Sequence, residues 1–194
     1  EENMQFTING INVEASEGMT ILQVARQYGI NIPTLCYLEN ISDIGSCRLC
    51  VVEIEGDSVL RTACNTKAKE GMVVYTRSER VIEARRTVLK LILADHYGDC
   101  LCCDKNGVCE LQKYCIEYGI NTSDYMGAAQ EKNMEIQDEN PFLSYDPAKC
   151  ITCQRCLMTC SKAAGRKAIT LGKKGVQALI KVPFGAGWDT SICE

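Results

Sequence analysis

The chain is poor in several residues on which common enzyme classes depend. Its 194 residues include one histidine, one tryptophan and three phenylalanines. With His96 as the only imidazole, no second histidine is present to act as a catalytic base. No glycine-rich dinucleotide fingerprint and no P-loop occur in the sequence. We therefore predict no catalytic residue here, and any hydride chemistry must lie elsewhere.

Long apolar runs are also missing. No stretch approaches the roughly 18 residues of a membrane helix, and the N-terminus lacks the basic and apolar regions of a secretory signal. The net charge of −4 gives no basic excess that would suggest a nucleic-acid partner. We therefore expect a cytoplasmic chain with no membrane span and no nucleic-acid partner.

Cysteine is the residue that the chain has in abundance, with 14 in total. Such a density indicates either a disulfide scaffold or metal binding. Because the cytosol keeps thiols reduced, and because the spacings described below are regular, metal ligands are favoured over disulfides.

Residues 1–77 predict a small α+β domain. Two short runs of alternating apolar and polar residues flank Asn9-Gly10, which is a strong hairpin signal. Thr20 and Gln23 form a capping box at the start of a short helix. The remaining strands are expected at 51–54, 58–61 and 72–76. The order hairpin, helix, hairpin, final strand is that of a β-grasp domain.

The first cysteine set falls in the loops of this domain. It consists of Cys36, Cys47, Cys50 and Cys64. Thiolates suit both iron–sulfur clusters and zinc. A [2Fe–2S] cluster needs four cysteines, and plant-type ferredoxins combine a cysteine-rich loop, a close C-x2-C pair and a remote fourth cysteine. Since a zinc ribbon usually has two C-x2-C knuckles and this set has one, the cluster is favoured over zinc.

Residues 78–119 predict a small helical domain. Ser78 is an N-cap for a helix across 79–95, whose apolar residues recur with helical spacing. Its polar face is expected to carry Arg80, Arg85, Arg86 and Lys90. A second helix is expected at about 109–118.

This domain contains one imidazole and three thiols within fourteen residues. They are His96, Cys100, Cys103 and Cys109. A lone histidine near a helix end is more often a surface residue, but the three cysteines that follow it indicate a metal site. Cys102 is an extra cysteine within this set. Cys115 has the spacing of a buried, small hydrophobic residue on the second helix.

Residues 120–145 are polar and are expected to form a linker. The last segment, 146–194, contains the bacterial ferredoxin run C-x2-C-x2-C-x3-C, at Cys150, Cys153, Cys156 and Cys160. In that run the first three cysteines hold one [4Fe–4S] cluster and the fourth ligates its neighbour. Cys193 would begin the second run. We therefore expect a two-[4Fe–4S] ferredoxin-like domain that is incomplete at its C-terminus, either cut from a longer chain or half-built.

The three cysteine sets in this order resemble one family. They are similar to the N-terminal iron–sulfur region shared by the complex I 75-kDa subunit, the α subunit of NAD-linked [FeFe] hydrogenases and NAD-dependent formate dehydrogenases. The matching stretches are 32–37, 45–53, 85–93 and 104–112. The resemblance implies a [2Fe–2S] cluster at the first set and a [4Fe–4S] cluster with one histidine ligand, His96, at the second. Cys102 matches no ligand. Cys160 and Cys193 point to the two-cluster branch, which includes electron-bifurcating complexes.

The expected function is a relay of single electrons through one [2Fe–2S] cluster and two to three [4Fe–4S] clusters. It would link a flavin (FMN)-containing, NAD(P)H-oxidising subunit to a terminal site or ferredoxin, in a hetero-oligomer of anaerobic metabolism that also includes a small [2Fe–2S] subunit. The position of His96 between the other sets makes its cluster the expected middle step. One alternative is the arm of a hydrogenase or formate dehydrogenase whose catalytic domain follows residue 194. Another is a zinc-structured interaction module.

Overall fold

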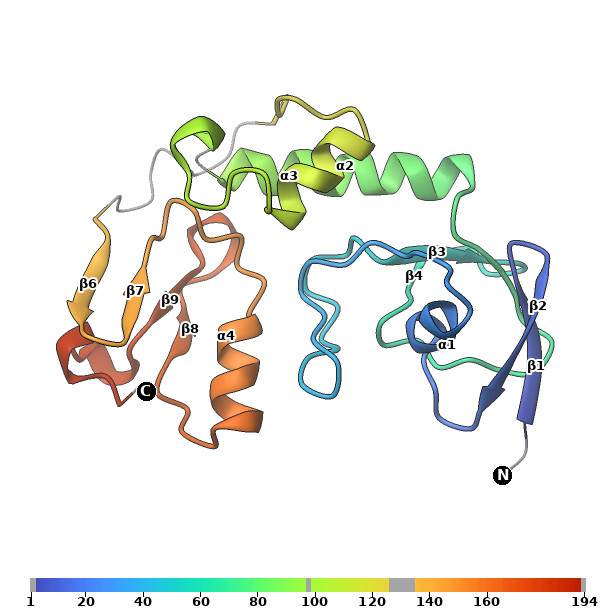
Figure 1. Ribbon diagram of the computed structural model, residues 1–194, viewed down its shortest axis with the longest axis horizontal. Helices are drawn as coiled ribbons and strands as arrows, with labels where there is room; N and C mark the ends of the chain where they lie inside the picture. Colours follow the sequence, from blue (N-terminus) through green and yellow to red (C-terminus); the bar gives the residue numbers. More distant parts are fainter. Residues whose placement is uncertain (1–2, 97–98, 126–134, 193–194) are drawn as a thin grey trace.

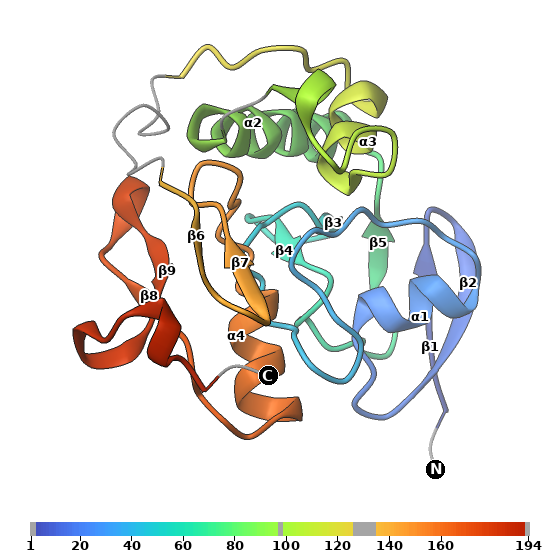
Figure 2. The same ribbon diagram turned by 60° about the vertical axis from the view of Figure 1, so that its left-hand side comes forward.

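The computed structural model describes residues 3–96, 99–125 and 135–192 (Figure 1). It is a mixed α/β structure, with an N-terminal lobe on the right of the view and a C-terminal lobe on the left. Helices α2 (Glu79–Asp95) and α3 (Glu110–Glu117) lie above both lobes in the two views (Figures 1 and 2). Within the described ranges, no helix is long and apolar enough to cross a membrane.

The N-terminal lobe is built on a five-stranded sheet in the order β2-β1-β5-β3-β4. Its strands are β1 (Asn3–Ile8), β2 (Ile11–Ser16), β3 (Val51–Ile54), β4 (Arg61–Thr62) and β5 (Val73–Tyr75). Strands β1 and β5 are parallel, and the other neighbours are antiparallel. The order of elements along the chain is the one that the sequence predicts.

Local sequence signals explain the first elements of this lobe. Asn9 and Gly10 form the predicted two-residue turn, with φ angles of 52° and 79°. Helix α1 (Ile21–Gln27) begins at the predicted capping box: the Thr20 hydroxyl accepts from the Gln23 amide at 3.3 Å, and the Gln23 side chain accepts from the Thr20 amide at 2.8 Å.

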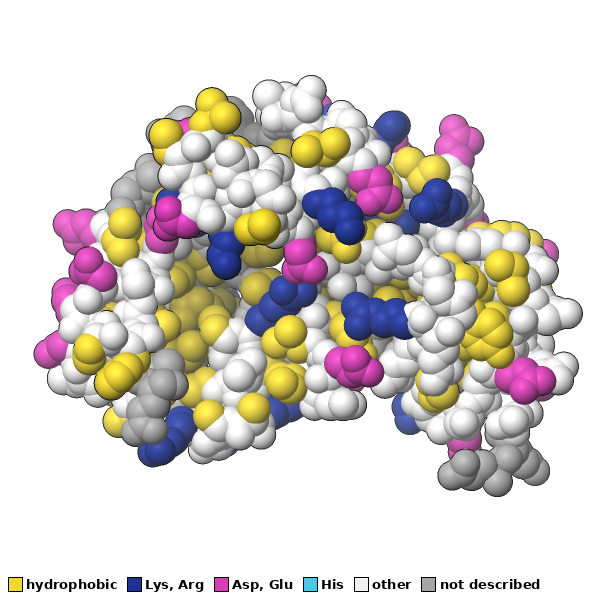
Figure 3. Space-filling model, in the orientation of Figure 1, with side chains coloured by type: hydrophobic (Ala, Val, Ile, Leu, Met, Phe, Trp, Pro, Cys, Tyr) yellow, Lys and Arg dark blue, Asp and Glu magenta, His cyan; other side chains and the backbone are white. Residues whose placement is uncertain are grey.

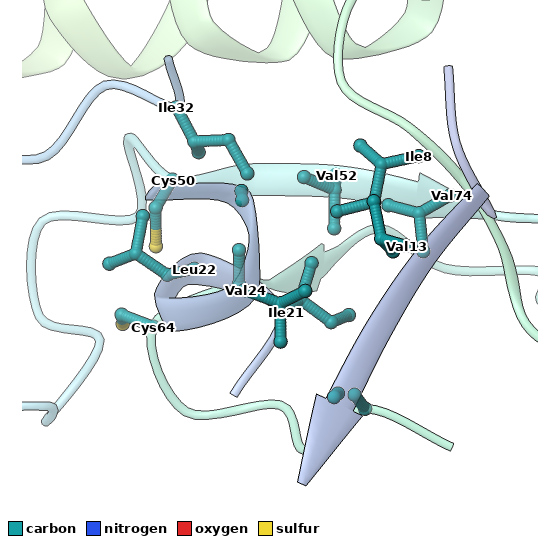
Figure 4. Close-up of a cluster of buried hydrophobic side chains, with 14 of the residues drawn as sticks. Ile8, Val13, Ile21, Leu22, Val24, Ile32, Cys50, Val52, Cys64 and Val74 are labelled. Atoms are coloured by element: carbon teal, nitrogen blue, oxygen red, sulfur yellow. The ribbon is translucent and has the colours of Figure 1, made fainter. Parts of the chain in front are cut away.

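Helix α1 packs on one face of the sheet and closes the core of the lobe (Figure 4). The buried side chains that meet there include Ile8, Val13, Ile21, Val24, Val52 and Val74. Cys50 and Cys64 lie together at one end of this core, on either side of Leu22. The core therefore fixes the position of two cysteines that the sequence predicts as ligands.

Helix α2 follows the predicted bounds, and Ser78 caps it by accepting from the Val81 amide at 3.3 Å. The expectation that Arg85 belongs to its polar face is wrong, because Arg85 is 2% exposed. Arg85 stands one turn after Val81 and one turn before Leu89, both fully buried. It therefore shares their stripe, since residues four apart lie on one face of a helix.

The C-terminal lobe contains two hairpins and a short helix. Its elements are β6 (Gln137–Asn140), β7 (Leu143–Tyr145), α4 (Arg155–Met158), a π-helical turn at Thr159–Ala163, β8 (Thr170–Gly172) and β9 (Leu179–Lys181). Short 3₁₀ turns occur at Gly175–Gln177, Pro183–Gly185 and Trp188–Thr190. Strands β6 and β7 pair with each other, as do β8 and β9.

The last part of the segment 120–145, which the sequence predicts to be a linker, contains the strands β6 and β7. Long-range contacts stabilise this hairpin. The buried Asn140 amide donates to the carbonyls of Trp188 and Ser191, both at 3.2 Å. The Tyr145 ring stacks on Trp188 with centroids 5.2 Å apart. Neither partner is visible in the local pattern from which the linker was predicted.

The packing of α2 predicts a large difference between two leucines of that helix. Leu89 is fully buried, whereas Leu91 is half exposed at 50%. We expect Leu89→Ala to lower the free energy of unfolding by about 2–5 kcal/mol, as for other buried leucines. Leu91→Ala should change it by less than about 0.5 kcal/mol. Anaerobic urea unfolding checks both values, and equal losses would contradict the packing described.

Candidate metal centres

The first predicted cysteine set gathers as two pairs. The Cys36 sulfur accepts a hydrogen bond from the Cys47 amide at 3.5 Å, and the two thiols also hydrogen-bond to each other. The thiols of Cys50 and Cys64 form the second pair. Three of the four side chains are 1% exposed, and Cys47 is partly buried. In a [2Fe–2S] centre each iron takes two ligands from the protein, so paired thiols suit it.

Hydrogen bonding within the pairs favours thiolate formation. The Cys36 thiol donates to Cys47 and lowers the pKa of Cys47 to about 6. The Cys64 thiol in the same way lowers the pKa of Cys50. These bonds raise the pKa of the donors Cys36 and Cys64, and burial adds to that rise. One thiol of each pair therefore has a lowered pKa, and a thiolate is the form that binds metal.

The loop before Cys47 has an unusual backbone. Gly45 has a φ of 65°, and a Cβ there would lie 2.9 Å from the Asn65 side-chain nitrogen. Arg48, between the two cysteines of the C-x2-C pair, also has a positive φ of 58°. Such conformations persist only where the surrounding structure holds them, and they are concentrated at functional sites.

The second predicted set lines a single cavity. His96 is the C-cap of α2, Cys100 begins a 3₁₀ turn, and Cys109 is the N-cap of α3. Together with Cys103, they face the same cavity. The exposed Cys102 does not line it. The structure thus brings all four predicted ligands together and leaves the extra cysteine outside.

Cys115 belongs to the hydrophobic cluster that joins α2 and α3. It is 7% exposed, and burial raises its pKa to about 11. Cys115 therefore stays protonated at neutral pH. It is a buried small residue, as its helical spacing predicts.

The third set lies on the loop before α4, on α4 itself and, for Cys160, on the π-helical turn that follows α4. The Cys150 sulfur accepts from the Thr152 amide at 3.4 Å, and the buried Cys160 sulfur accepts from the Ala168 amide at 3.1 Å. Thr152 and Gln154 have positive φ values of 50° and 61°. For a β-branched threonine this conformation is a strained one.

Amide hydrogen bonds to sulfur are one of the means by which proteins tune clusters, so the loop suits thiolate ligands. Cys153 and Cys156 complete the run and lie on either side of Arg155, at the start of α4. Cys150 and Cys160 pack on one small core with Trp188. Cys193, the remaining predicted ligand, lies outside the described residues.

The donor groups suit clusters of several irons. Among the residues that the structure describes, no three His, Cys, Asp or Glu side chains are arranged around one point for a single metal ion. The thiols instead form pairs or line a cavity, which suits clusters whose protein ligands are distributed over several irons.

The first and third sites touch each other. The Ser46 hydroxyl donates to the Thr152 carbonyl at 3.5 Å, and the Gln154 side-chain amide donates to the Ser46 hydroxyl at 3.2 Å. The thiols of Cys47 and Cys153 lie close enough to interact electrostatically. The loops that carry these two cysteines therefore form a direct contact.

The second and third sites share a cavity. It is lined by Cys103 and Cys109 on one side and by Ile151 and Cys153 on the other. Arg155 at the start of α4 pairs with Glu110 at the start of α3, at 2.9 Å. Figure 3 shows this face of the molecule hollowed between the helices and the C-terminal lobe, with Lys and Arg side chains around apolar ones.

Sequence reasoning missed three residues that matter at these sites. Ser46 and Gln154 meet across more than a hundred residues, and no local pattern signals that contact. Arg85 links α2 to β3 and to the C-terminal end of α3 through hydrogen bonds to Val51 and Tyr118. Its spacing of four residues from Val81 and Leu89 is the sequence signal that indicates its burial.

The cavity of the second site predicts different outcomes for two adjacent cysteines. We expect Cys103→Ala to lose the four irons of one [4Fe–4S] cluster, because Cys103 lines the cavity. Cys102→Ala should keep full iron and acid-labile sulfide, because Cys102 points elsewhere. Iron and sulfide analysis of anaerobically purified protein checks both. Loss of iron in the Cys102 variant alone would show that the ligand assignment is wrong.

Two family models match this chain. The 2Fe-2S iron-sulfur cluster binding domain matches residues 1–79. The NADH-ubiquinone oxidoreductase-G iron-sulfur binding region, a 4Fe-4S family, matches residues 85–124. The expectation of both [2Fe–2S] and [4Fe–4S] cofactors is therefore confirmed.

Curated relatives match along nearly the whole chain. The NADPH-Fe(3+) oxidoreductase subunit alpha of Geobacter sulfurreducens is 36% identical over 190 residues, which are 98% of this chain and 22% of the relative. The NADP-reducing hydrogenase subunit HndD of Solidesulfovibrio fructosivorans is 40% identical over 195 residues, covering 98% of this chain and 33% of the relative. The chain thus spans about a fifth to a third of these relatives.

A solved structure matches over most of its own length. It is a chain in the crystal structure of NAD+-reducing [NiFe]-hydrogenase in the H2-reduced state, with a TM-score of 0.89 and 30% identity. The match covers 98% of this chain and 80% of that one. The chain therefore belongs to the iron–sulfur family that its cysteine pattern resembles, which unites subunits of NAD(P)-linked hydrogenases with the complex I 75-kDa subunit.

Proposed function

We propose that this chain is the electron-relay part of an NAD(P)-linked oxidoreductase. Cys36, Cys47, Cys50 and Cys64 hold a [2Fe–2S] cluster. His96, Cys100, Cys103 and Cys109 hold a [4Fe–4S] cluster. Cys150, Cys153 and Cys156 belong to a third site, and Cys160 with Cys193 to a fourth. When bound, these clusters supply one-electron carriers whose potentials depend on ligand type, hydrogen bonds and burial.

The proposed sites divide the chain into functional units. A β-grasp unit across 1–77 carries the first site, and a helical unit across 78–119 carries the second. A ferredoxin-like unit across 146–194 carries the rest. Part of the connecting segment, β6 and β7, packs with this last unit through Asn140 and Tyr145.

The contacts of the loop that carries Cys153 are the observation that supports a relay best. Residues 151–155 touch the Cys47 loop on one side and share a cavity with Cys103 on the other. We infer that the third site, rather than the His96 site, stands between the other two. Chain order favoured the His96 site as the middle step, and spatial contact favours the third.

The names of the relatives support a proposal for the rest of the assembly. Their names describe subunits of NAD(P)H-linked enzymes. We propose a hetero-oligomer in the cytoplasm, in which a flavin-containing, NAD(P)H-oxidising subunit exchanges electrons with this chain. From Cys160 and Cys193 we propose that the chain belongs to the two-cluster branch, with ferredoxin and a small [2Fe–2S] subunit as further partners and electron bifurcation as the reaction type.

The relay is tested by removing the proposed middle site. After flash photoreduction of the holoprotein, freeze-quench EPR follows electron exchange between the [2Fe–2S] and His96 clusters. We expect Cys153→Ala to slow this exchange strongly while both flanking signals remain, because residues 151–155 contact both sites. Cys102→Ala is the matched control. An unchanged exchange rate in a Cys153 variant that lacks the third cluster would contradict the proposed order.

The second site predicts a redox effect of its histidine. We expect His96→Cys to retain a cluster but to lower its midpoint potential, because an anionic thiolate replaces a neutral imidazole. An EPR-monitored redox titration measures the shift. A variant whose potential and EPR signal match the wild type would show that His96 is not a ligand.

A further inference from the structure

Arg85 is a charged side chain with no place in the relay described so far. It is 2% exposed and is the largest of the fully buried side chains among the described residues. It projects from the middle of α2 toward β3 and α3 rather than toward solvent. Arginine stays protonated at any physiological pH. A permanent positive charge therefore lies inside the protein.

The hydrogen-bond partners of Arg85 are all neutral. Its Nη2 donates to the Val51 carbonyl at 2.8 Å, and its Nη1 donates to the Tyr118 hydroxyl at 2.9 Å. Its Nε has no partner among the described residues. Every ion pair in the described part of the chain involves another cation. The protein thus positions the guanidinium without neutralising it.

A buried charge without a counter-charge is strongly unfavourable, since desolvation costs several kcal/mol even after relaxation. Proteins retain such groups where they are paired or where they serve a site. A negative charge close to Arg85 would remove the penalty. Arg85 is therefore expected to lie near a group that is anionic in the functional protein.

The residues around Arg85 adjoin the first cluster site. Val51 directly follows Cys50, and it pairs in the sheet with Thr62, two residues before Cys64. The carbonyl that accepts from Arg85 therefore lies on a strand that adjoins one pair of predicted ligands. An iron–sulfur cluster held by four thiolates is anionic, and it gains a further negative charge on reduction.

We propose that Arg85 is the buried counter-charge of the [2Fe–2S] cluster and raises its reduction potential. This inference rests on the proposed function, because it needs a cluster at the first site. Arg85 acts as a positioning residue through the Val51 carbonyl and through its charge, and does not itself bind iron. Because Arg85 is buried, salt screens its charge much less than it screens that of a surface cation.

A purely structural role makes a different prediction. The two hydrogen bonds also clamp α2 to β3 and α3, so any substitution could loosen the fold. A clamp depends on the shape of the guanidinium and is lost with lysine. A counter-charge depends on the charge and is kept with lysine. The two roles are therefore separated by comparing Arg85→Met with Arg85→Lys.

Arg86 provides a matched control on the same helix. Its Nε donates to the Tyr118 carbonyl at 3.2 Å, but the side chain is exposed. Arg86→Met removes the same formal charge one residue away, in water. Its effect on the potential should be within experimental error.

The experiment is an EPR-monitored redox titration of the [2Fe–2S] cluster in the anaerobic holoprotein. We expect a lower midpoint potential in Arg85→Met, a potential near that of the wild type in Arg85→Lys, and the same shifts at low and high salt. An unchanged potential in Arg85→Met overturns the proposal. Equal downward shifts in the Met and Lys variants overturn it in favour of the clamp.

If Arg85→Met loses its iron, Arg85→Lys still tests the proposal. Arg85→Lys must then keep the wild-type potential, and a lowered potential in that variant alone overturns the proposal. Wild-type protein without a [2Fe–2S] signal would instead refute the proposed function itself. The two failures are thus distinguishable.

Discussion

One hydrophobic cluster between α2, α3 and the cysteine loops is the constraint on which the three sites depend. An apolar residue lies close to a predicted ligand in each segment: Leu35 precedes Cys36, Leu49 precedes Cys50, Leu111 of α3 follows Cys109 by two residues, and Ile151 follows Cys150. Leu35, Leu49 and Leu111 belong to the same buried cluster as Leu89 of α2, and Ile151 packs against that cluster. Because close packing transmits small shifts, this shared core sets the mutual position of loops that are distant in the chain.

The same core explains how strained loops persist. Arg48, Thr152 and Gln154 have positive φ values, although none of them is glycine. Their neighbours are fixed by the burial of Leu49 and the partial burial of Ile151. The packed residues hold the loops, and the strained residues turn amide groups toward sulfur, as the Thr152 amide does toward Cys150. Packing energy thus compensates local strain.

The sequence predicts what is local. The Asn9-Gly10 hairpin, the capping box at Thr20 and the bounds of α2 follow from signals within a few residues, and the structure has all three. Cysteine spacing predicts the ligand sets in the same way. The β6–β7 hairpin and the burial of Arg85 were not predicted. The hairpin depends on Trp188, more than forty residues away, and the burial of Arg85 on β3 and α3.

The arrangement of the sites shows why chain order is a poor guide to a relay. Along the sequence His96 separates the first cysteine set from the third. In space, Ser46 hydrogen-bonds to the loop that carries Cys153, and the same loop shares a cavity with Cys103. Electron transfer depends on spatial separation and not on position in the chain. In the proposed relay, the ferredoxin-like segment therefore connects the two N-terminal sites, and α2, which carries Arg85 and packs against both of them, fixes their spacing.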